Sequence, residues 1–198
     1  MIKFENLNLE APYIKFKELY DKSSRLEQKN IEAICIGSLS SKKKEVNSRY
    51  VNLKLIDGNE FIFFSNYNSP KSIEFSSHNQ ISALIYWNNI NTQIRMKALI
   101  KKTNKEFNQT YFSTRDIRKN ALAISSNQSE YIEHYDNVKK NYKRSLKEDN
   151  LTECPEYWGG FSFIPYYFEF WEGHNSRINK REAFNMIDGN WRHSFLQP

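Results

Sequence analysis

The sequence predicts a mainly β fold, an antiparallel Greek-key-like barrel with helices at its periphery. About seven or eight short segments have strand character, and most follow one another through turns instead of long helical crossovers. Such a succession is typical of a barrel and not of a doubly wound sheet. Aromatic residues reach 15% of the chain although its mean hydropathy is −0.77, which excludes a chain that is disordered throughout. The 198 residues suit one domain, which we expect at residues 12–198 after an N-terminal tail at residues 1–11.

The first expected element is a helix at residues 12–29. Its apolar residues form an imperfect stripe, made of Ile14, Phe16, Leu19, Tyr20 and Leu26. Pro12 suits the first helical position, because proline has no N–H group that needs a partner there.

Strands and a hairpin are expected next. A mostly apolar run at residues 31–39 predicts one strand, and residues 49–57 alternate between two faces, which predicts another. Asp57-Gly58 is a strong turn signal, and residues 60–65 complete a hairpin after it.

The remaining elements alternate between short helices and strands. Ser69 and Pro70 are residue types that begin helices. Helices are expected at residues 70–77, 105–113, 115–124 and 130–147. Strands are expected at residues 80–87, 92–102, 161–171, 176–179, 182–186 and 191–196.

The charge balance suggests an anionic partner without identifying it. The net charge is +6 and the pI is near 9.1, which fits a nucleic acid or a small anionic ligand such as a phosphate ester. Lys42, Lys43 and Lys44 form the densest basic run, either as a solvated hairpin loop or as a phosphate-binding tip. Glycine-rich phosphate loops and other common enzyme motifs are missing, so side-chain cations and hydroxyls would have to hold a phosphate.

Several compartments and site types are not expected. No apolar stretch approaches the roughly 20 residues that span a bilayer, and the N-terminus has no secretory h-region. Cys35 and Cys154 form no CxxC pair, and the four histidines lack metal-ligand spacing. We therefore expect a cytoplasmic protein without a metal site or a membrane partner.

Candidate anion-binding residues occur near the first hairpin. Arg49 and Lys54 differ in parity and should point to opposite faces of a regular strand. Lys71 lies at the start of an expected helix, where backbone N–H groups favour anions. Taken alone, Arg49 and Lys54 fit ordinary surface charges better than ligand-binding residues, and Ser69-Pro70 fits an ordinary helix cap better than an anion site.

Four motifs in the C-terminal third are more specific. They are Y-W-G-G-F at residues 157–161, F-E-F-W-E-G at 168–173, R-I-N-K-R at 177–181 and W-R-H-S-F-L-Q-P at 191–198. In their order and spacing they resemble the pyridoxine (pyridoxamine) 5'-phosphate oxidase family. The resemblance continues upstream through R-x-V-x-L-K at 49–54, residues 63–71, Gln93, Y-F-x-x-R at 111–115, and Gln128-Ser129. It covers residues 12–198.

The resemblance implies an FMN-binding split β-barrel that works as a homodimer, with the flavin at the subunit interface. The implied cofactor-binding residues are Arg49, Tyr50, Val51, Lys54, Phe64, Ser65, Lys71, Gln93, Gln128, Ser129, Trp171 and Arg181. The implied substrate-binding positions are Lys54, Tyr111, Arg115, Lys119, Arg177 and Asn179, with Arg177 as the catalytic residue. Two phosphate groups, one on each ligand, would require such clustered cations.

The sequence also departs from the family pattern. Asn179 and Lys180 replace the His and Asp of R-L-H-D-R, Lys119 replaces a Ser that contacts the substrate phosphate, and Pro70 replaces an Arg. Asparagine can still form hydrogen bonds, but it cannot carry a proton as histidine does. The N-terminal segment that covers the substrate in some members has no counterpart in residues 1–10.

The expected function is therefore an FMN-dependent oxidase acting on a small phosphorylated ring, with O2 as acceptor and pyridoxal 5'-phosphate as product. One alternative is a related flavin oxidase acting on another ring, as in phenazine biosynthesis. Another is a protein that binds flavin or a B6 phosphate without turnover. A nucleic-acid binder is supported only by the net charge and the aromatic content.

Overall fold

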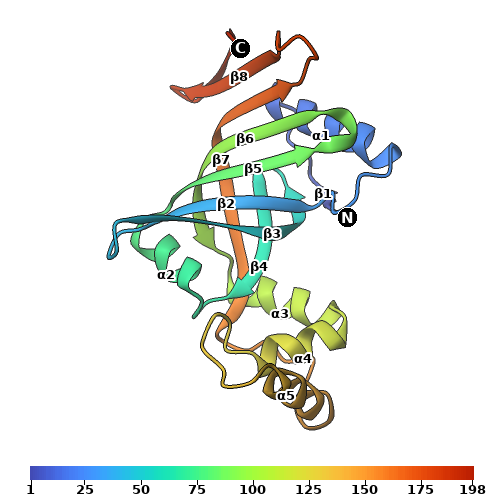
Figure 1. The fold of residues 1–198 in the computed structure, drawn as a ribbon, viewed down its shortest axis with the longest axis vertical. Coiled ribbons are helices and arrows are strands. Elements are labelled where there is room, and N and C mark those ends of the chain that lie inside the picture. The colour runs from blue at the N-terminus through green and yellow to red at the C-terminus, as the bar shows by residue number, and fades with distance from the viewer.

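A computed structural model describes residues 1–198 as one sheet of nine strands with helices around it (Figure 1). The strands are β1 (Lys3–Glu5), β2 (Ala33–Ser40), β3 (Glu45–Asp57), β4 (Glu60–Asn66), β5 (Gln80–Trp87), β6 (Thr92–Lys102), β7 (Trp158–Glu172), β8 (Lys180–Ile187) and β9 (Asn190–Leu196). The helices are α1 (Ala11–Arg25), α2 (Pro70–Ser77), α3 (Lys105–Thr114), α4 (Ile117–Ser125) and α5 (Tyr135–Glu148), with a 3₁₀ turn at Asn88–Ile90.

The sheet closes on itself to form a barrel. Strands β3, β2, β5, β6, β7 and β4 pair in this order, and β4 returns to β3. The hairpin of β8 and β9 continues the sheet beyond β7 and extends from the barrel (Figure 1). All pairs are antiparallel except β1 with β3. The predicted mainly β split barrel with peripheral helices is confirmed.

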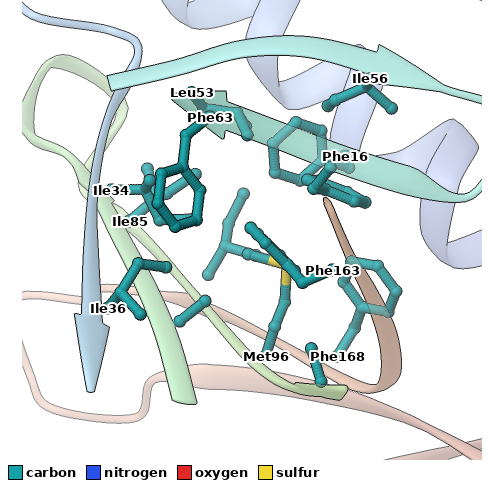
Figure 2. Packing of buried hydrophobic residues seen from close by; sticks show 14 of the residues in the cluster. Phe16, Ile34, Ile36, Leu53, Ile56, Phe63, Ile85, Met96, Phe163 and Phe168 are labelled. Atoms are coloured by element: carbon teal, nitrogen blue, oxygen red, sulfur yellow. The ribbon is translucent and has the colours of Figure 1, made fainter. Parts of the chain in front are cut away.

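The core fills the inside of this ring. Alternate residues of β5 are buried, ending with Trp87, and a cluster of 25 buried apolar residues extends through the barrel. Figure 2 shows Ile34, Phe63 and Met96 converging on this interior from different strands. Helix α1 places Phe16 edge-on against Trp87, with the ring centroids 5.6 Å apart. These aromatic contacts anchor α1 to the barrel.

Most predicted elements are confirmed, and the differences have local causes. The helix expected at residues 130–147 begins only at Tyr135. The strand expected at residues 176–179 is wrong, because this segment is a turn between β7 and β8. Arg177 has a φ of +61° there, and its N–H donates to the carbonyl of His174. The expected N-terminal tail contains β1, and the neighbouring Ile2 is buried in the core.

Helices α3, α4 and α5 gather at the end of the barrel where β4 and β7 meet (Figure 1). Helix α2 lies on the side of the barrel where the β2–β3 hairpin extends. None of the helices combines the length and the apolar character needed to cross a membrane.

Candidate functional site

A cavity of about 860 Å³ opens between β3, β4, α2 and the α3–α4 connection. This volume is typical of a small-molecule site. Many of the predicted ligand-binding residues line it: Arg49, Tyr50, Val51, Lys54, Phe64, Ser65, Lys71, Tyr111, Arg115, Gln128 and Ser129. The fold therefore brings together residues from segments far apart in the chain.

Strand β3 directs both Arg49 and Lys54 into this cavity. The prediction that they point to opposite faces is wrong, because the pairing of β3 with β4 shifts register between Leu53 and Leu55. A β-bulge of this kind changes which face the following residues occupy. The bulge thus adds Lys54 to the wall that carries Arg49.

Arg49 is held by an acidic residue of α2. Its guanidinium donates to the buried carboxylate of Glu74 at 2.9 Å and to the carbonyl of Ile36 at 3.2 Å. The Ser38 hydroxyl and the Asn47 amide also donate to Glu74. This network fixes the orientation of Arg49, and it also neutralises much of the arginine's charge before any ligand binds.

Lys71 is a buried cation without an acidic partner within salt-bridge distance. Its residue is only 7% exposed, and its ammonium group donates to the Ser69 hydroxyl at 3.1 Å. Burial and the nearby Arg49 charge lower the pKa of Lys71 to about 8, against the opposing effect of Glu74. Ser69 precedes α2 as predicted, but its hydroxyl donates to the carbonyl of Asn66 instead of capping the helix. A buried, uncompensated ammonium group is typical of an anion site.

An aromatic stack forms the opposite end of the cavity. The rings of Phe64 and Tyr111 lie nearly parallel with centroids 3.7 Å apart, and Trp158 continues the stack at 5.1 Å from Phe64. The Arg115 guanidinium lies 5.0 Å from the Trp158 ring and donates to the Asn120 side chain at 3.2 Å. Arg115 is therefore positioned both by stacking and by hydrogen bonding.

Lys54 belongs to the same end. Burial lowers its pKa, and the charges of Lys119 and Arg115 act in the same direction, while Glu32 at 3.8 Å opposes them. Lys119 is near enough to influence Lys54, although it does not line the cavity. The cavity thus has a cationic group at each end, one around Lys71 and one around Lys54.

The loop that carries Gln128 and Ser129 is attached to the end of β4. The Gln128 side-chain oxygen accepts hydrogen bonds from the Ser65 hydroxyl at 3.2 Å and from the Asn66 N–H at 3.3 Å. Ser129 has a φ of +72°, in the left-handed region. Both residues therefore take defined places in the cavity wall.

A second set of predicted residues lies outside the cavity. Gln93 pairs with Trp171, and Trp171 pairs with Arg181, so the three form one row across β6, β7 and β8. The Arg181 guanidinium donates twice to Glu169, at 2.8 and 2.9 Å, and Glu169 is only 2% exposed. We call Gln93, Trp171 and Arg181 the aromatic row.

Arg177 and Asn179 lie next to this row, in the turn between β7 and β8. The Asn179 side-chain oxygen accepts the N–H of His174 at 2.9 Å, and this contact stabilises the turn. Arg177 is exposed. A single chain therefore holds the predicted residues in two separate places, and it does not bring Arg177 to the cavity.

Several cavity residues were not predicted as site residues. Glu74, Asn47 and Ile73 line the cavity, and no sequence motif distinguishes them. Lys42 and Lys43 also line it, and the basic run at residues 42–44 was the signal that could have identified them.

The comparisons with known proteins identify the family. Residues 158–198 match the family model for the pyridoxine 5'-phosphate oxidase C-terminal dimerisation region. A pyridoxine/pyridoxamine 5'-phosphate oxidase of Coxiella burnetii is 31% identical over 193 residues, covering 96% of this chain and 97% of the relative. Pyridoxine/pyridoxamine 5'-phosphate oxidase 1 of Hydrogenovibrio crunogenus is 30% identical over 192 residues, covering 94% of this chain and 88% of the relative. The chain belongs to the pyridoxine/pyridoxamine 5'-phosphate oxidase family.

Solved structures support the same fold. PhzG from Burkholderia lata, solved in complex with tetrahydrophenazine-1-carboxylic acid, matches with a TM-score of 0.89 at 20% identity and covers 94% of this chain and 92% of its own. A pyridoxamine 5'-phosphate oxidase-related, FMN-binding protein from Nostoc punctiforme matches with a TM-score of 0.76 at 11% identity, covering 96% and 99%. The family's barrel is thus present over almost the whole chain.

Proposed function

We propose that this protein is an FMN-dependent oxidase of the pyridoxamine/pyridoxine 5'-phosphate oxidase type, with pyridoxal 5'-phosphate as product. The observation that carries the proposal is the buried, unpaired Lys71 beside Arg49 in a cavity of suitable size. Donors of this chemistry fit the phosphate of FMN. When bound, FMN would supply a two-electron acceptor for oxidation of a substrate C–N or C–O bond, with O2 as the final acceptor.

Two regions of the cavity would divide the two ligands between them. Arg49, Lys71 and Ser65 would hold the phosphate and ribityl parts of FMN, together with Tyr50, Val51, Lys54, Phe64, Gln128 and Ser129. Lys54, Tyr111 and Arg115 would bind the substrate phosphate at the other end, with Lys119 nearby. The Tyr111 hydroxyl and the two cations are suitable donors for a phosphate dianion.

A second subunit would complete the site. Trp171, Arg177, Asn179 and Arg181 lie within the segment that matches a dimerisation region, whereas the cavity residues precede it in the chain. In a two-fold symmetric dimer, the aromatic row and Arg177 of one subunit can meet the cavity of the other. Exposed Tyr50 and Leu84 on the outer face of the barrel supply apolar area for such contact.

Arg177 would then orient the substrate ring from the partner's side and stabilise charge near the reacting carbon. It is exposed within one subunit, as a residue that acts across an interface should be. Asn179 would provide an amide N–H donor where the family has a histidine, since its oxygen already accepts the N–H of His174.

Oxidation of another ring substrate is the second candidate. Asn179 removes a titratable group, and Lys119 adds a positive charge near Lys54 and Arg115. Lys119 lies near the substrate end of the cavity, and Asn179 would reach this end only across the subunit interface. The added charge of Lys119 favours a substrate with more negative charge than pyridoxamine 5'-phosphate.

Two measurements test the proposal. The purified protein should be yellow, or should become so after addition of FMN, and it should convert pyridoxamine 5'-phosphate to the aldehyde. A folded protein that ignores FMN would refute the proposal. Flavin binding with reduction by another ring amine or alcohol, but not by the B6 phosphates, would favour the second candidate.

A further inference from the structure

The β2–β3 hairpin places two lysines in the wall of the cavity. Lys42 and Lys43 line it together with Arg49 and Lys71, whereas the adjacent Lys44 does not. The hairpin extends on the side of the barrel that carries α2 (Figure 1), and Ser38 and Asn47 of its strands both donate to Glu74 of α2. Lys42 and Lys43 therefore belong to the Lys71 end of the cavity.

The hairpin ends in a tight turn, and Lys42 and Lys43 form no salt bridge there. The N–H of Lys43 donates to the Ser40 hydroxyl at 3.3 Å, and Lys44 has a φ of +56° that allows the tight turn. The side chains of Lys42 and Lys43 are exposed and form no salt bridge with any acidic residue. Their ammonium groups are thus free for a ligand.

The formal charges of the other residues at this end of the cavity sum to zero, although Lys71 itself has no acidic partner within salt-bridge distance. Arg49 and Lys71 contribute positive charge, but Glu74 and Glu45 line the same wall and contribute as much negative charge. Pro70, which also lines the wall, offers neither a charge nor an N–H donor. Without the hairpin, a phosphate with a charge of about −2 near pH 7 would meet no net positive charge here.

We propose that Lys42 and Lys43 bind the phosphate group of the cofactor and supply the net positive charge that this end of the cavity otherwise lacks. This inference rests on the proposed function, because it assumes that FMN is the ligand. If the proposal is correct, Lys42 and Lys43 contribute, together with Arg49 and Lys71, to the preference of the protein for FMN over riboflavin.

The test compares FMN with riboflavin, which lacks the phosphate. Both are titrated against the full-length apoprotein at about 50 mM salt, with flavin fluorescence as readout, in the wild type and in the double variant Lys42→Gln/Lys43→Gln. We expect the double variant to bind FMN roughly tenfold more weakly than the wild type does. Its affinity for riboflavin should be unchanged. The loss for FMN should shrink at about 1 M salt, where the Debye length falls to about 3 Å.

A matched control separates a local contact from a change in total charge. The double variant Lys44→Gln/Lys140→Gln removes as much charge, and neither residue lines the cavity. We expect it to leave both affinities within about twofold of the wild type, since neither side chain lines the cavity and exposed charges are screened by salt.

Three results would overturn the inference. They are an unchanged affinity of the Lys42→Gln/Lys43→Gln variant for FMN, an equal loss for FMN and riboflavin, and an equal loss in the control variant. In each of these the wild type still binds FMN, so the proposed function stands. A wild type that binds neither flavin would instead overturn the proposed function and this inference with it.

Discussion

The cavity wall and the aromatic row carry their positive charge in opposite ways. Lys71 is buried in the cavity with only the Ser69 hydroxyl as partner, and its pKa is lowered to about 8. Arg181 in the row is bound twice by Glu169, which also accepts a hydrogen bond from Arg95. The cavity thus contains a cation whose anionic partner would have to be a ligand, whereas the arginine of the aromatic row is already neutralised by Glu169 of the same chain.

This difference suggests what each region contributes. A buried charge without a partner costs stability, and a site retains it only for a ligand that compensates it. A neutralised arginine next to an indole ring is better suited to support a flat, weakly charged surface. The cavity would select the phosphate, and the aromatic row would position the ring system.

The largest effect is expected from recombining the two regions between subunits. Lys71→Met should weaken FMN binding in the cavity, and Arg177→Ala should remove the side chain proposed to orient the substrate ring. Each homodimer should therefore be nearly inactive when FMN is limiting. Mixed dimers should contain one intact site. Random mixing should therefore restore about a quarter of wild-type activity, because about half of the dimers are mixed and each holds one of two sites.

This recovery is measured on the unfractionated product of co-expression. Mixed dimers isolated through two different affinity tags should show about half of wild-type activity, since every dimer then holds one intact site of two. Mixed dimers that form but remain inactive would show that one subunit builds its own complete site, and would refute the shared arrangement.

The next prediction compares how one substitution in each region, Lys71→Met in the cavity and Arg181→Met in the aromatic row, changes the stability of the apoprotein. Lys71→Met should weaken FMN binding by roughly thirtyfold, because a charged hydrogen bond contributes about 1.5–3 kcal/mol. The same change should raise the melting temperature of the apoprotein, since methionine fills similar space without a charge. Arg181→Met should instead lower the free energy of unfolding by about 1–3 kcal/mol, because the buried Glu169 loses its principal partner.

Thermal unfolding of the two apoproteins measures this contrast, and circular dichroism checks that both are folded. Equal destabilisation by both changes would mean that Lys71 is compensated within the chain after all.

The pH dependence gives a smaller effect of defined sign. The pKa of Lys71 falls from its ordinary value of 10.5 to about 8 on folding, so the unfolded chain holds more protons than the folded apoprotein between these values. The contribution of Lys71 to apoprotein stability should therefore increase as the pH rises through this interval. FMN affinity should fall as the pH rises above about 8, because Lys71 then loses its charge.

Both trends are measured between about pH 7 and 9.5 as differences between wild type and Lys71→Met, which removes the contribution of other groups. A difference that stays flat over this range would contradict the assignment of the shifted pKa to Lys71.

The smallest effect concerns the substrate end. Lys119→Ser removes a positive charge that lowers the pKa of Lys54. Because Lys119 is exposed, the KM for pyridoxamine 5'-phosphate should rise by no more than about fivefold, with little change in kcat. A fall in KM would mean that Lys119 selects against this substrate, and would favour the second candidate function. Arg118→Ser, at the preceding position of α4, is the matched control, since it removes the same charge from a residue that does not influence Lys54.

The sequence alone determined which segments form most of the strands of the barrel, and it supplied most of the candidate site residues. The apolar patterns of residues 80–87 and 92–102, and the turn signal at Asp57-Gly58, predicted strands that the structure confirms, because these signals are local. The ordered motifs identified the family for the same reason, since residue identities and spacing are written in the chain.

Only the tertiary structure decided which of these residues meet. Lys54 lines the same cavity as Arg49 because of a bulge in the pairing of β3 with β4. The alternation of residues along one strand does not predict such a register shift. The neutralisation of Arg49 by Glu74, the isolation of Lys71, and the separation of the aromatic row from the cavity all depend on contacts between distant segments. Burial and charge pairing are properties of the folded arrangement, so no single stretch of sequence contains them.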